Sequence, residues 1–359
     1  MNTGQFSQRL LEWWSENKRS LPWKNQTDPY KIWLSEIILQ QTRIEQGTPY
    51  YHRFLILFPD VKALADATTD QVMKAWQGLG YYSRARNLHQ TAKQIVELHH
   101  SVFPQDYDGL LKLKGIGPYT AAAIGSFAYE LPYPVVDGNV IRLVSRINGI
   151  TRPVDTKEVL NEIYLFVQDA IRQTKPSEFN QALMDFGALV CIPGKPDCIK
   201  CPMNDYCSAY HQSLVQTIPY KSKRVQKVIR YFHYYDIQDT SGNTIIIQRT
   251  ENDIWKNLYE FPMIETTAET TPGRDDITGL LLKILPENEL GATPVKVVKL
   301  KQILTHRIIH ADFHKISLNC TFGEIKQPYC LVDSQKVSNF AFPKIITSYL
   351  ENNSGSKNY

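Results

Sequence analysis

The spacing of hydrophobic residues divides this chain into a helical part and a strand-rich part. Up to about residue 215, apolar residues recur at i, i+3, i+4 and i+7, which is the period of amphipathic helices. This pattern predicts helices over residues 8–16, 30–46, 70–80, 84–100 and 157–173. Glycine and proline separate several of these segments, as at Gly78-Leu79-Gly80. The first half is therefore expected to be all-α.

After Pro219 the pattern changes to the alternation that is typical of β-strands. Every second residue from Ile229 to Ile237 is expected to share one face, and the turn signal Ser241-Gly242-Asn243 precedes a further apolar run at 244–249. Residues 295–322 predict two or more additional strands, and residues 275–285 predict a helix. The polar tail at 351–359 is expected to be disordered. The second half is thus expected to be α+β.

Length and composition indicate an ordinary globular protein with more than one domain. The chain has 359 residues, of which 43% are hydrophobic and 21% charged. A chain of this length exceeds what one hydrophobic core usually organises, so two or three domains are expected. The net charge of +4 permits a polyanionic partner without proving one. Basic residues do cluster, but on its own this cluster is interpreted as a solvated linker; its members are Lys221, Lys223, Arg224, Lys227 and Arg230.

The N-terminus has no apolar signal-peptide core, and no apolar run approaches membrane-spanning length. We therefore expect a cytoplasmic protein without membrane association. In a reducing compartment, clustered cysteines are metal ligands more often than disulfides.

Four cysteines, at Cys191, Cys198, Cys201 and Cys207, have the spacing C-x6-C-x2-C-x5-C. Four thiolates this close in sequence can converge on an iron–sulfur cluster or on a tetrahedral zinc ion. Structural zinc usually shows two short pairs, whereas this segment has one short pair flanked by longer gaps, which favours the cluster. Two further cysteines, at positions 320 and 330, are expected to be ordinary buried thiols.

A glycine-rich corner lies at residues 110–128. Gly115 and Gly117 form a tight turn, and Pro118 stands at the first position of the next, alanine-rich helix. Such a corner brings the backbone and the helix N-terminus close to a partner, which suits a DNA phosphate. A plain helix–turn–helix corner is the alternative.

Two carboxylates are candidates for acid–base chemistry. Glu36 is flanked by apolar residues, so its pKa is expected to be raised, although it also fits a polar stripe shared with Gln40. Asp137 follows an apolar run and precedes glycine, where it either acts in catalysis or caps the next helix.

Together these segments resemble the MutY family of adenine DNA glycosylases, which belongs to the helix–hairpin–helix superfamily. The resemblance covers nearly the whole chain and is carried by residues 21–42, 78–89, 113–124, 136–146 and 179–191 and by the cysteine spacing. Residues 254–262 and 304–320 resemble the degenerate Nudix-like domain of that family. The chain lacks the metal-binding helix of Nudix hydrolases, so no diphosphate-cleaving site is expected.

The resemblance implies a multidomain architecture. It consists of a helix–hairpin–helix glycosylase domain at 1–215 with an iron–sulfur loop at 191–207, a basic linker at 216–229, a Nudix-like lesion-recognition domain at 230–350, and the tail. The implied cofactor is a 4Fe-4S cluster. The implied partner is double-stranded DNA with an A·8-oxoguanine or A·G mispair, bound by a monomer that is associated with the nucleoid.

The family chemistry assigns roles to individual residues. Glu36 matches the acid that protonates adenine, and Asp137 matches the carboxylate that stabilises the sugar cation. Tyr119 and Asn139 match residues that position this chemistry. The other matches are Arg19, Trp23 and Gln181 in the adenine pocket, Gln41 and Tyr81 beside the lesion in the duplex, and Thr305 and His306 in the lesion-checking loop.

Tyr119 also separates this chain from endonuclease III–like lyases, which carry a Schiff-base lysine at that position. A monofunctional glycosylase in base excision repair is therefore expected. A T/G mismatch glycosylase can also carry tyrosine there, but it would not need the second half of the chain. A non-catalytic damage sensor is disfavoured by the intact carboxylates, and an electron carrier by the large DNA-binding-like framework.

The chain departs from the family pattern at two places. Leu304-Thr305-His306 stands where Phe-Ser-His is usual, which keeps the hydroxyl but loses the ring. Lys24 replaces an arginine, which weakens any bidentate contact at that position.

Overall fold

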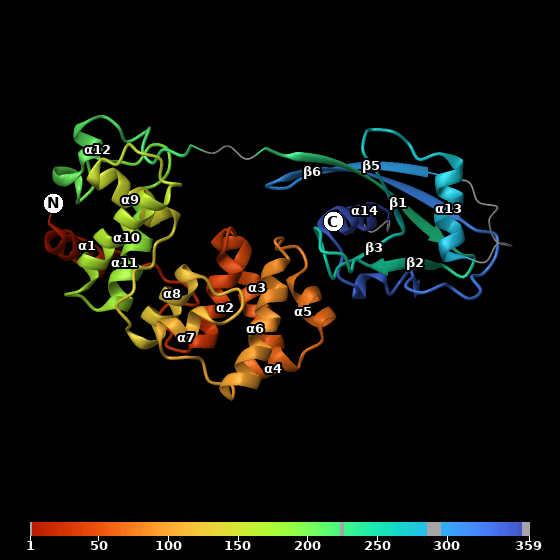
Figure 1. Ribbon diagram of the computed structural model, residues 1–359, viewed down its shortest axis with the longest axis horizontal. Coiled ribbons are helices and arrows are strands. Elements are labelled where there is room, and N and C mark those ends of the chain that lie inside the picture. Colours follow the sequence, from red (N-terminus) through yellow and green to blue (C-terminus); the bar gives the residue numbers. More distant parts are fainter. Residues whose placement is uncertain (1, 223–225, 286–295, 354–359) are drawn as a thin grey trace. The chain divides into compact units, whose positions relative to one another are not determined.

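The structure is a computed structural model that describes residues 2–222, 226–285 and 296–353. The chain divides into two compact units. One comprises Met1–Asp66 and Asn87–Arg224, and the other comprises Ala67–Arg86 and Val225–Tyr359. The architecture confirms the predicted fold class, a helical core followed by a domain with a mixed sheet (Figure 1).

The first unit is helical throughout its regular structure. Its α-helices are α1 (Thr3–Asn17), α2 (Pro29–Leu39), α3 (Ile44–Leu57), α4 (Val61–Asp66), most of α6 (Ser83–His99), α7 (Tyr107–Leu111), α8 (Pro118–Tyr129), α9 (Gly138–Asn148), α10 (Lys157–Ile171), α11 (Pro176–Leu189) and α12 (Ser208–His211). A 3-10 turn, η1, covers Asn204–Tyr206. One core joins α1, α9, α10 and α11 around residues such as Phe6 and Phe186.

The segment at 30–46, predicted as one helix, is two helices, and that prediction was wrong. Helix α2 ends at Leu39, and α3 begins at Ile44. Gln41 between them adopts a left-handed backbone with φ 54°, which an α-helix cannot accommodate. The break leaves Gln40 and Gln41 between the two helices, where both line the cleft described below.

The second unit contains a mixed sheet of seven strands. They are β1 (Val228–Gln238), β2 (Asn243–Gln248), β3 (Tyr259–Glu260), β4 (Met263–Thr266), β5 (Lys296–Ile303), β6 (Arg307–Ser317) and β7 (Cys330–Asp333). The order is β3-β2-β1-β6-β5, with β4 beside β1 and β7 beside β2. Among the strands that the structure describes, only β1 and β6 pair in parallel, from Val228 opposite Arg307 to Gln238 opposite Ser317.

Helices cover both faces of this sheet, which corrects the expectation of a simply alternating strand. Helix α13 (Arg274–Ile284) packs on the face that carries Tyr235 and Ile316. Helix α14 (Lys344–Asn353) packs on the other face, where Tyr349 stacks on Phe313. Residues 232–237 of β1 are consequently buried on both faces. The other elements of this unit are α5 (Thr69–Trp76) and the 3-10 turn η3 (Val337–Asn339).

The short segment Ala67–Arg86 is joined to the second unit by polar contacts. The Asp70 carboxylate accepts hydrogen bonds from Gln248 Nε2 and from the Tyr259 hydroxyl, both at 3.0 Å. Lys74 Nζ donates to the Phe340 carbonyl at 3.0 Å. The sequence pattern assigned this segment to the helical half, and nothing in its periodicity indicates these distant partners.

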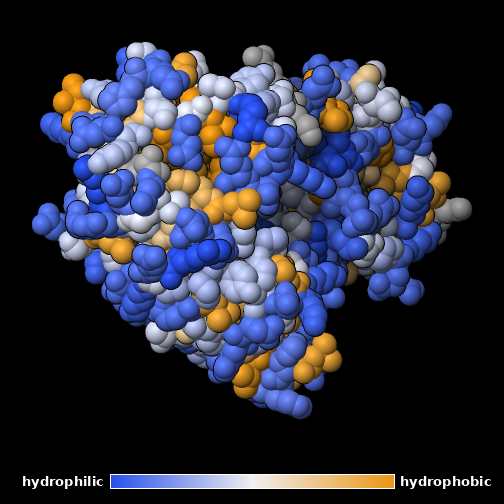
Figure 2. All heavy atoms as spheres, turned by 60° about the vertical axis from the view of Figure 1, so that its left-hand side comes forward, coloured by the Kyte–Doolittle hydropathy of each residue, from blue (hydrophilic) through white to orange (hydrophobic). Residues whose placement is uncertain are grey.

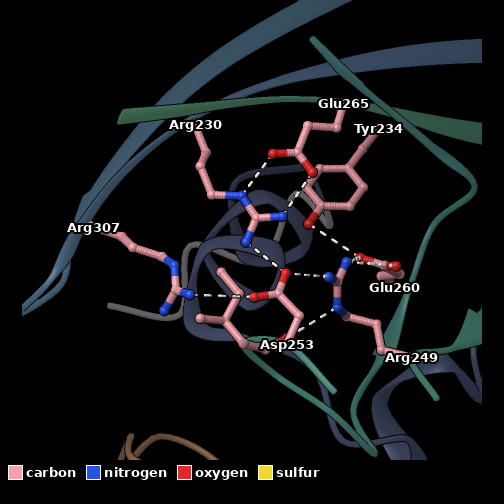
Figure 3. A network of polar contacts seen from close by, with 8 residues as sticks. Arg230, Tyr234, Arg249, Asp253, Glu260, Glu265 and Arg307 are labelled. Carbon is pink, nitrogen blue, oxygen red and sulfur yellow. Dashed lines mark hydrogen bonds and ion pairs between the residues drawn. The ribbon is translucent and has the colours of Figure 1, made fainter. Parts of the chain in front are cut away.

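A network of ion pairs lies in the second unit and includes Arg230, which the sequence analysis placed in the solvated cluster of basic residues (Figure 3). Arg230 donates to both oxygens of Glu265 at 2.6 Å and to Asp253 at 2.5 Å. Assigning Arg230 to a solvated cluster was therefore wrong. The network also contains Tyr234, Arg249, Glu260 and Arg307. Residues 223–225 of the predicted linker lie outside the described residues, as do residues 354–359 of the predicted tail.

The two remaining cysteines are exposed, so the expectation that they are buried was wrong. Cys320 lies in the loop after β6, and Cys330 begins β7, which pairs with β2. The view in Figure 2 shows hydrophobic residues scattered among a majority of hydrophilic ones. Within the described part of the chain, no helix combines the length and the apolar character needed to cross a bilayer.

Candidate active site

A cleft of about 620 Å³ in the first unit brings together most of the residues that were predicted to act on the base. Helices α2, α8, α9 and α11 and the turn after α2 form its walls. The predicted residues in its lining are Arg19, Trp23, Glu36, Gln41, Tyr119, Asp137, Asn139 and Gln181. Tyr81, Thr305 and His306 belong to the second unit.

Glu36 lies on α2 and is 7% exposed. Burial raises its pKa to about 7, the nearby charge of Asp137 adds to the rise, and a hydrogen bond from Tyr119 acts against it. The interpretation of Glu36 as a position on an exposed polar stripe is thereby excluded. A carboxyl group with this pKa is a proton donor near neutral pH.

Tyr119 reaches Glu36 because α8 packs closely on α2. After the buried Thr120, α8 continues with the small and buried Ala121, Ala122 and Ala123, and small residues allow helices to pack closely. The Tyr119 hydroxyl donates to Glu36 Oε2 at 2.7 Å. Burial, and then the charges of Glu36 and Asp137, raise the pKa of Tyr119 well above its ordinary value. The phenol therefore stays neutral and acts as a donor.

Asp137 both caps a helix and faces the cleft, so the two alternatives for this residue are compatible. Its Oδ1 accepts from the backbone amides of Asn139 and Val140, each at 2.8 Å, at the start of α9. Its Oδ2 accepts from Asn139 Nδ2 at 2.8 Å. The cap and the amide side chain fix the carboxylate in one orientation.

Asn139 is itself held by a buried arginine that sequence reasoning missed. Arg142 Nη2 donates to Asn139 Oδ1 at 2.9 Å and to the Gly187 carbonyl at 2.6 Å. Its Nε donates to the Cys191 carbonyl at 2.7 Å. Gly187 is required here, since a Cβ on it would lie 2.6 Å from the Cβ of Asn139. One guanidinium thus connects the cleft to the first cysteine of the loop.

Asp185 is a second residue that the sequence analysis missed. It is fully buried on α11 and forms ion pairs with Arg19, at 2.5 Å, and with Lys24. The Trp14 indole donates to the same carboxylate at 2.9 Å. Burial opposes ionisation of Asp185, but the hydrogen bonds from Lys24 and Trp14 hold its pKa below the ordinary value. Asp185 could have been recognised in the sequence as an acidic residue that stands among apolar residues.

The glycine corner adopts the predicted conformation between α7 and α8. Gly115 has φ +75°, and a Cβ there would lie 2.7 Å from the Asn87 Cβ, so only glycine fits. Gly117 caps α8, is exposed and has open space around it, and Pro118 is the first residue of the helix. The first-turn amides of α8 are thereby presented at an accessible corner.

The four clustered cysteines line a single pocket, together with apolar residues that include Leu143 and Phe186. Arg146 Nη1 lies 3.5 Å from Cys191 Sγ, which places a positive charge beside this sulfur atom. Burial raises the pKa of the Cys201 thiol to about 12, and it also raises the pKa values of Cys198 and Cys207. Thiolates are favourable in this pocket when a metal centre compensates their charge, so the donor set fits a metal group.

Three of the residues predicted to contact the lesion, Tyr81, Thr305 and His306, lie together in the second unit. The Tyr81 hydroxyl forms a hydrogen bond with Thr305 Oγ1. Thr305 and His306 are exposed in the turn between β5 and β6, which the hydrogen bond from Leu304 N to the Arg307 carbonyl closes at 2.8 Å. Residues 78–83 and 302–307 line one groove of about 570 Å³. Gln41 lies in the first unit and is exposed.

Comparisons with known proteins agree with this geometry. Residues 34–167 match the HhH-GPD superfamily of base excision DNA repair proteins, and residues 233–352 match the NUDIX domain. A solved thermostable thymine-DNA glycosylase superposes with a TM-score of 0.55 at 27% identity, over 58% of this chain and 97% of that one. Fold and site therefore define a base-excision DNA glycosylase.

The curated relatives identify the family more closely. The adenine DNA glycosylase of Buchnera aphidicola (subsp. Schizaphis graminum) is 32% identical over 354 residues, which cover 96% of this chain and 98% of that protein. The human adenine DNA glycosylase is 36% identical over 213 residues, or 57% of this chain and 39% of that protein. The chain belongs to the adenine DNA glycosylase family, whose members hydrolyse N-glycosidic bonds in base excision repair.

Proposed function

We propose that this chain is a monofunctional glycosylase that removes adenine mispaired with 8-oxoguanine or with guanine in double-stranded DNA. The observation that carries the proposal is the arrangement of Glu36, Tyr119 and Asp137 in one cleft. It supplies a proton donor, a neutral phenol and an oriented carboxylate. The amine of Lys24, which also lines the cleft, is held in an ion pair with the buried Asp185.

Base removal begins when the target adenine leaves the stack and enters the cleft. Glu36, which is protonated in a large fraction of molecules near neutral pH, donates its proton to the adenine ring and makes it a better leaving group. Positive charge then develops on the sugar, where Asp137 stabilises it electrostatically or covalently and subsequently assists the attack of water. Asn139 keeps the Asp137 carboxylate in position through its 2.8 Å hydrogen bond.

The absence of strand cleavage follows from Tyr119. A lyase needs an amine at this position to form a Schiff base with the opened sugar, and a phenol cannot form one. Because burial and two nearby carboxylates keep this phenol neutral, it is also a poor nucleophile. We infer that Tyr119 orients the Glu36 proton and takes no covalent part.

Recognition divides between the two units. Arg19, Trp23 and Gln181 line the cleft and would contact the flipped adenine. Gln41 and Tyr81, both with left-handed backbone and exposed side chains, would enter the duplex beside the lesion. Thr305 and His306 would check the opposite base. Gly115 and Gly117 would bring backbone amides to a phosphate.

A 4Fe-4S cluster on Cys191, Cys198, Cys201 and Cys207 would fix the loop structurally. The C-x6-C-x2-C-x5-C spacing, with one short pair between longer gaps, favours this cluster over tetrahedral zinc, and the four cysteines line one pocket that could hold it. Lys195 and Lys200 are exposed on this loop, where they suit DNA phosphates.

We further propose that the chain acts as a cytoplasmic, nucleoid-associated monomer. In this proposal, residues 1–215 provide base excision, residues 216–229 form a linker, and residues 230–350 read the lesion.

Single-turnover assays on A·8-oxoguanine, A·G and T·G duplexes, with and without alkali, test the proposal. Adenine release from the first two and strand breaks only after alkali are expected. Release of thymine, or strand breaks without alkali, would instead support a mismatch glycosylase or a lyase. Brown protein with about four irons per chain is expected after anaerobic purification, and stoichiometric zinc would refute the cluster.

A further inference from the structure

We propose that the second unit contains a binding site for a divalent transition metal, formed by His233, Asp312 and His314. Neighbouring strands place these residues together. In the parallel pairing of β1 and β6, His233 stands opposite Asp312, and His314 follows two residues later on the same face. Asp312 and His314 form an Asp-x-His motif on β6, while His233 comes from β1, about eighty residues earlier in the chain.

The three side chains converge at distances suited to one ion. One ligand atom from each residue lies within 4.8 Å of the other two, and His233 Nδ1 is 3.9 Å from Asp312 Oδ2. Both histidines are 4% exposed. Ligand atoms around zinc in a tetrahedral site lie about 3.3 Å apart, so small side-chain rotations would complete the site.

Hydrogen bonding orients the His233 ring for ligation. The Thr266 hydroxyl donates to the Ala268 carbonyl at 2.8 Å, so its oxygen accepts the bond from His233 Nε2 at 3.2 Å. The proton therefore resides on Nε2, and Nδ1 presents a lone pair toward Asp312. Fixing the tautomer in this way is typical of metal-binding histidines.

Two buried nitrogen atoms at the site lack partners. Neither His233 Nδ1 nor His314 Nε2 has a hydrogen bond to any residue that the structure describes. An unsatisfied buried polar atom costs free energy, and a metal ion would satisfy both at once. Burial lowers the pKa of each histidine, which keeps the imidazoles in the neutral form that binds metals.

The types of ligand atom indicate which metals the site would bind. Two imidazoles and one carboxylate suit zinc or cobalt better than calcium or magnesium, which prefer oxygen ligands. A cavity of about 180 Å³, whose lining includes Glu269 and Thr270, adjoins His233 and Asp312 and leaves room for water or a fourth ligand. The site would tie β1 to β6.

The ammonium group of Lys299, on β5, would compete with a metal ion for the Asp312 carboxylate. Its ammonium lies 3.5 Å from Asp312 Oδ2, while its side chain is 71% exposed and free to turn outward. A cation at the site must displace this ammonium, so Lys299→Ala should bind metal more tightly. Lys301 is the matched control, because it lines the same cavity from β5 but forms no ion pair with Asp312 among the described residues.

The site is tested by calorimetric titration with zinc chloride of the full-length protein, after dialysis against a mild chelator that removes only loosely bound divalent metal. The background is a Cys320→Ser, Cys330→Ser variant that retains its cysteine-loop cluster, so the exposed thiols cannot bind zinc. One equivalent is expected to bind. Asp312→Asn and His314→Gln should each weaken that event by about a hundredfold or abolish it, while the exposed His52→Gln should leave it unchanged.

The lysine variants and the melting temperatures distinguish a metal site from an anion site and from non-specific zinc binding. Lys299→Ala should tighten zinc binding several-fold and Lys301→Ala should not. An anion site would show the opposite response to loss of a lysine. Zinc should raise the melting temperature of the parent and of Lys299→Ala, but not of His314→Gln. Equal zinc binding by the parent, Asp312→Asn and His314→Gln, or no binding by any of them, would overturn the site. Matching melting temperatures without zinc show that the variants fold.

Discussion

The Tyr119 hydroxyl and the Glu36 carboxyl share a 2.7 Å hydrogen bond inside the cleft, and the two groups influence each other's ionisation in opposite ways. The bond from the phenol lowers the pKa of Glu36 against the larger effect of burial. The Glu36 carboxylate raises the pKa of the phenol. Catalysis that depends on a protonated Glu36 is therefore tuned by Tyr119.

Base excision should slow as the pH rises through about 7, where Glu36 loses its proton. Tyr119→Phe removes the hydrogen bond that lowers this pKa, so the falling limb of the pH profile should move to higher pH. Single-turnover rates on an A·8-oxoguanine duplex measure the shift. Tyr107→Phe, outside the cleft, is the control and should leave the limb in place. A limb that moves to lower pH in Tyr119→Phe would contradict the assignment.

Glu36 should also make stability depend on pH. Its pKa is about 7 in the folded protein against an ordinary value of 4.5, so between these values the folded state holds a proton that the unfolded state has lost. The unfolding free energy therefore falls as the pH rises across this window, by about 3 kcal/mol in total for this group. Glu36→Gln removes the effect.

The measurement is the melting temperature of the parent and of Glu36→Gln at both ends of that window. The variant should be inactive yet more stable than the parent above pH 7, because it buries no charge. If the parent instead became more stable relative to the variant as the pH rises, the raised pKa of the buried Glu36 carboxyl group would be refuted.

Asp137→Asn should separate the structural role of Asp137 from its chemical one. The amide oxygen can still accept the backbone bonds that cap α9, so folding and DNA binding should persist. It cannot balance the positive charge of the sugar, and the rate should fall by about a hundredfold to a thousandfold. Asp28→Asn, which changes the cap of α2, is the matched control. Unfolding of the variant, or a near-normal rate, would count against this division.

Arg142→Lys should affect the cleft and the cysteine loop together. A lysine cannot donate at once to Asn139, Gly187 and Cys191 as the guanidinium does. We expect a lower excision rate and a lower iron content per chain, each measured on the same preparation. Arg152→Lys, which replaces an exposed partner of Glu158 and Glu162, should change neither. Loss of one property without the other would show that the two sites are not linked through Arg142.

Local sequence patterns predicted much of the secondary structure of this protein. The features they did not predict depend on contacts between residues that are distant in sequence. The turn at Gly115, the cap at Asp137 and the helix at 275–285 depend on neighbours a few residues away. The Arg230 network and the partners of Asp185 join residues separated by tens to more than a hundred positions. The left-handed Gln41 interrupts an unbroken helical pattern, so periodicity alone could not locate the break.

The contact between Tyr81 and Thr305 provides the sharpest test of lesion reading. These residues are 224 positions apart, yet they share a hydrogen bond within the second unit. If they act together on the base opposite adenine, Tyr81→Phe and Thr305→Val should each reduce the preference for 8-oxoguanine over guanine. One hydrogen bond corresponds to about 1 kcal/mol, or roughly a fivefold change in that ratio.

The double variant decides whether the two residues are coupled. Because each single change already breaks the shared bond, Tyr81→Phe combined with Thr305→Val should lose little more than either alone. Thr305→Ser, which keeps the hydroxyl, should retain the preference. The ratio of single-turnover rates on A·8-oxoguanine and A·G duplexes is the readout, and Tyr81→Phe keeps the ring, so binding to the duplex should be largely preserved. Losses that simply add would show that Tyr81 and Thr305 contribute to recognition independently.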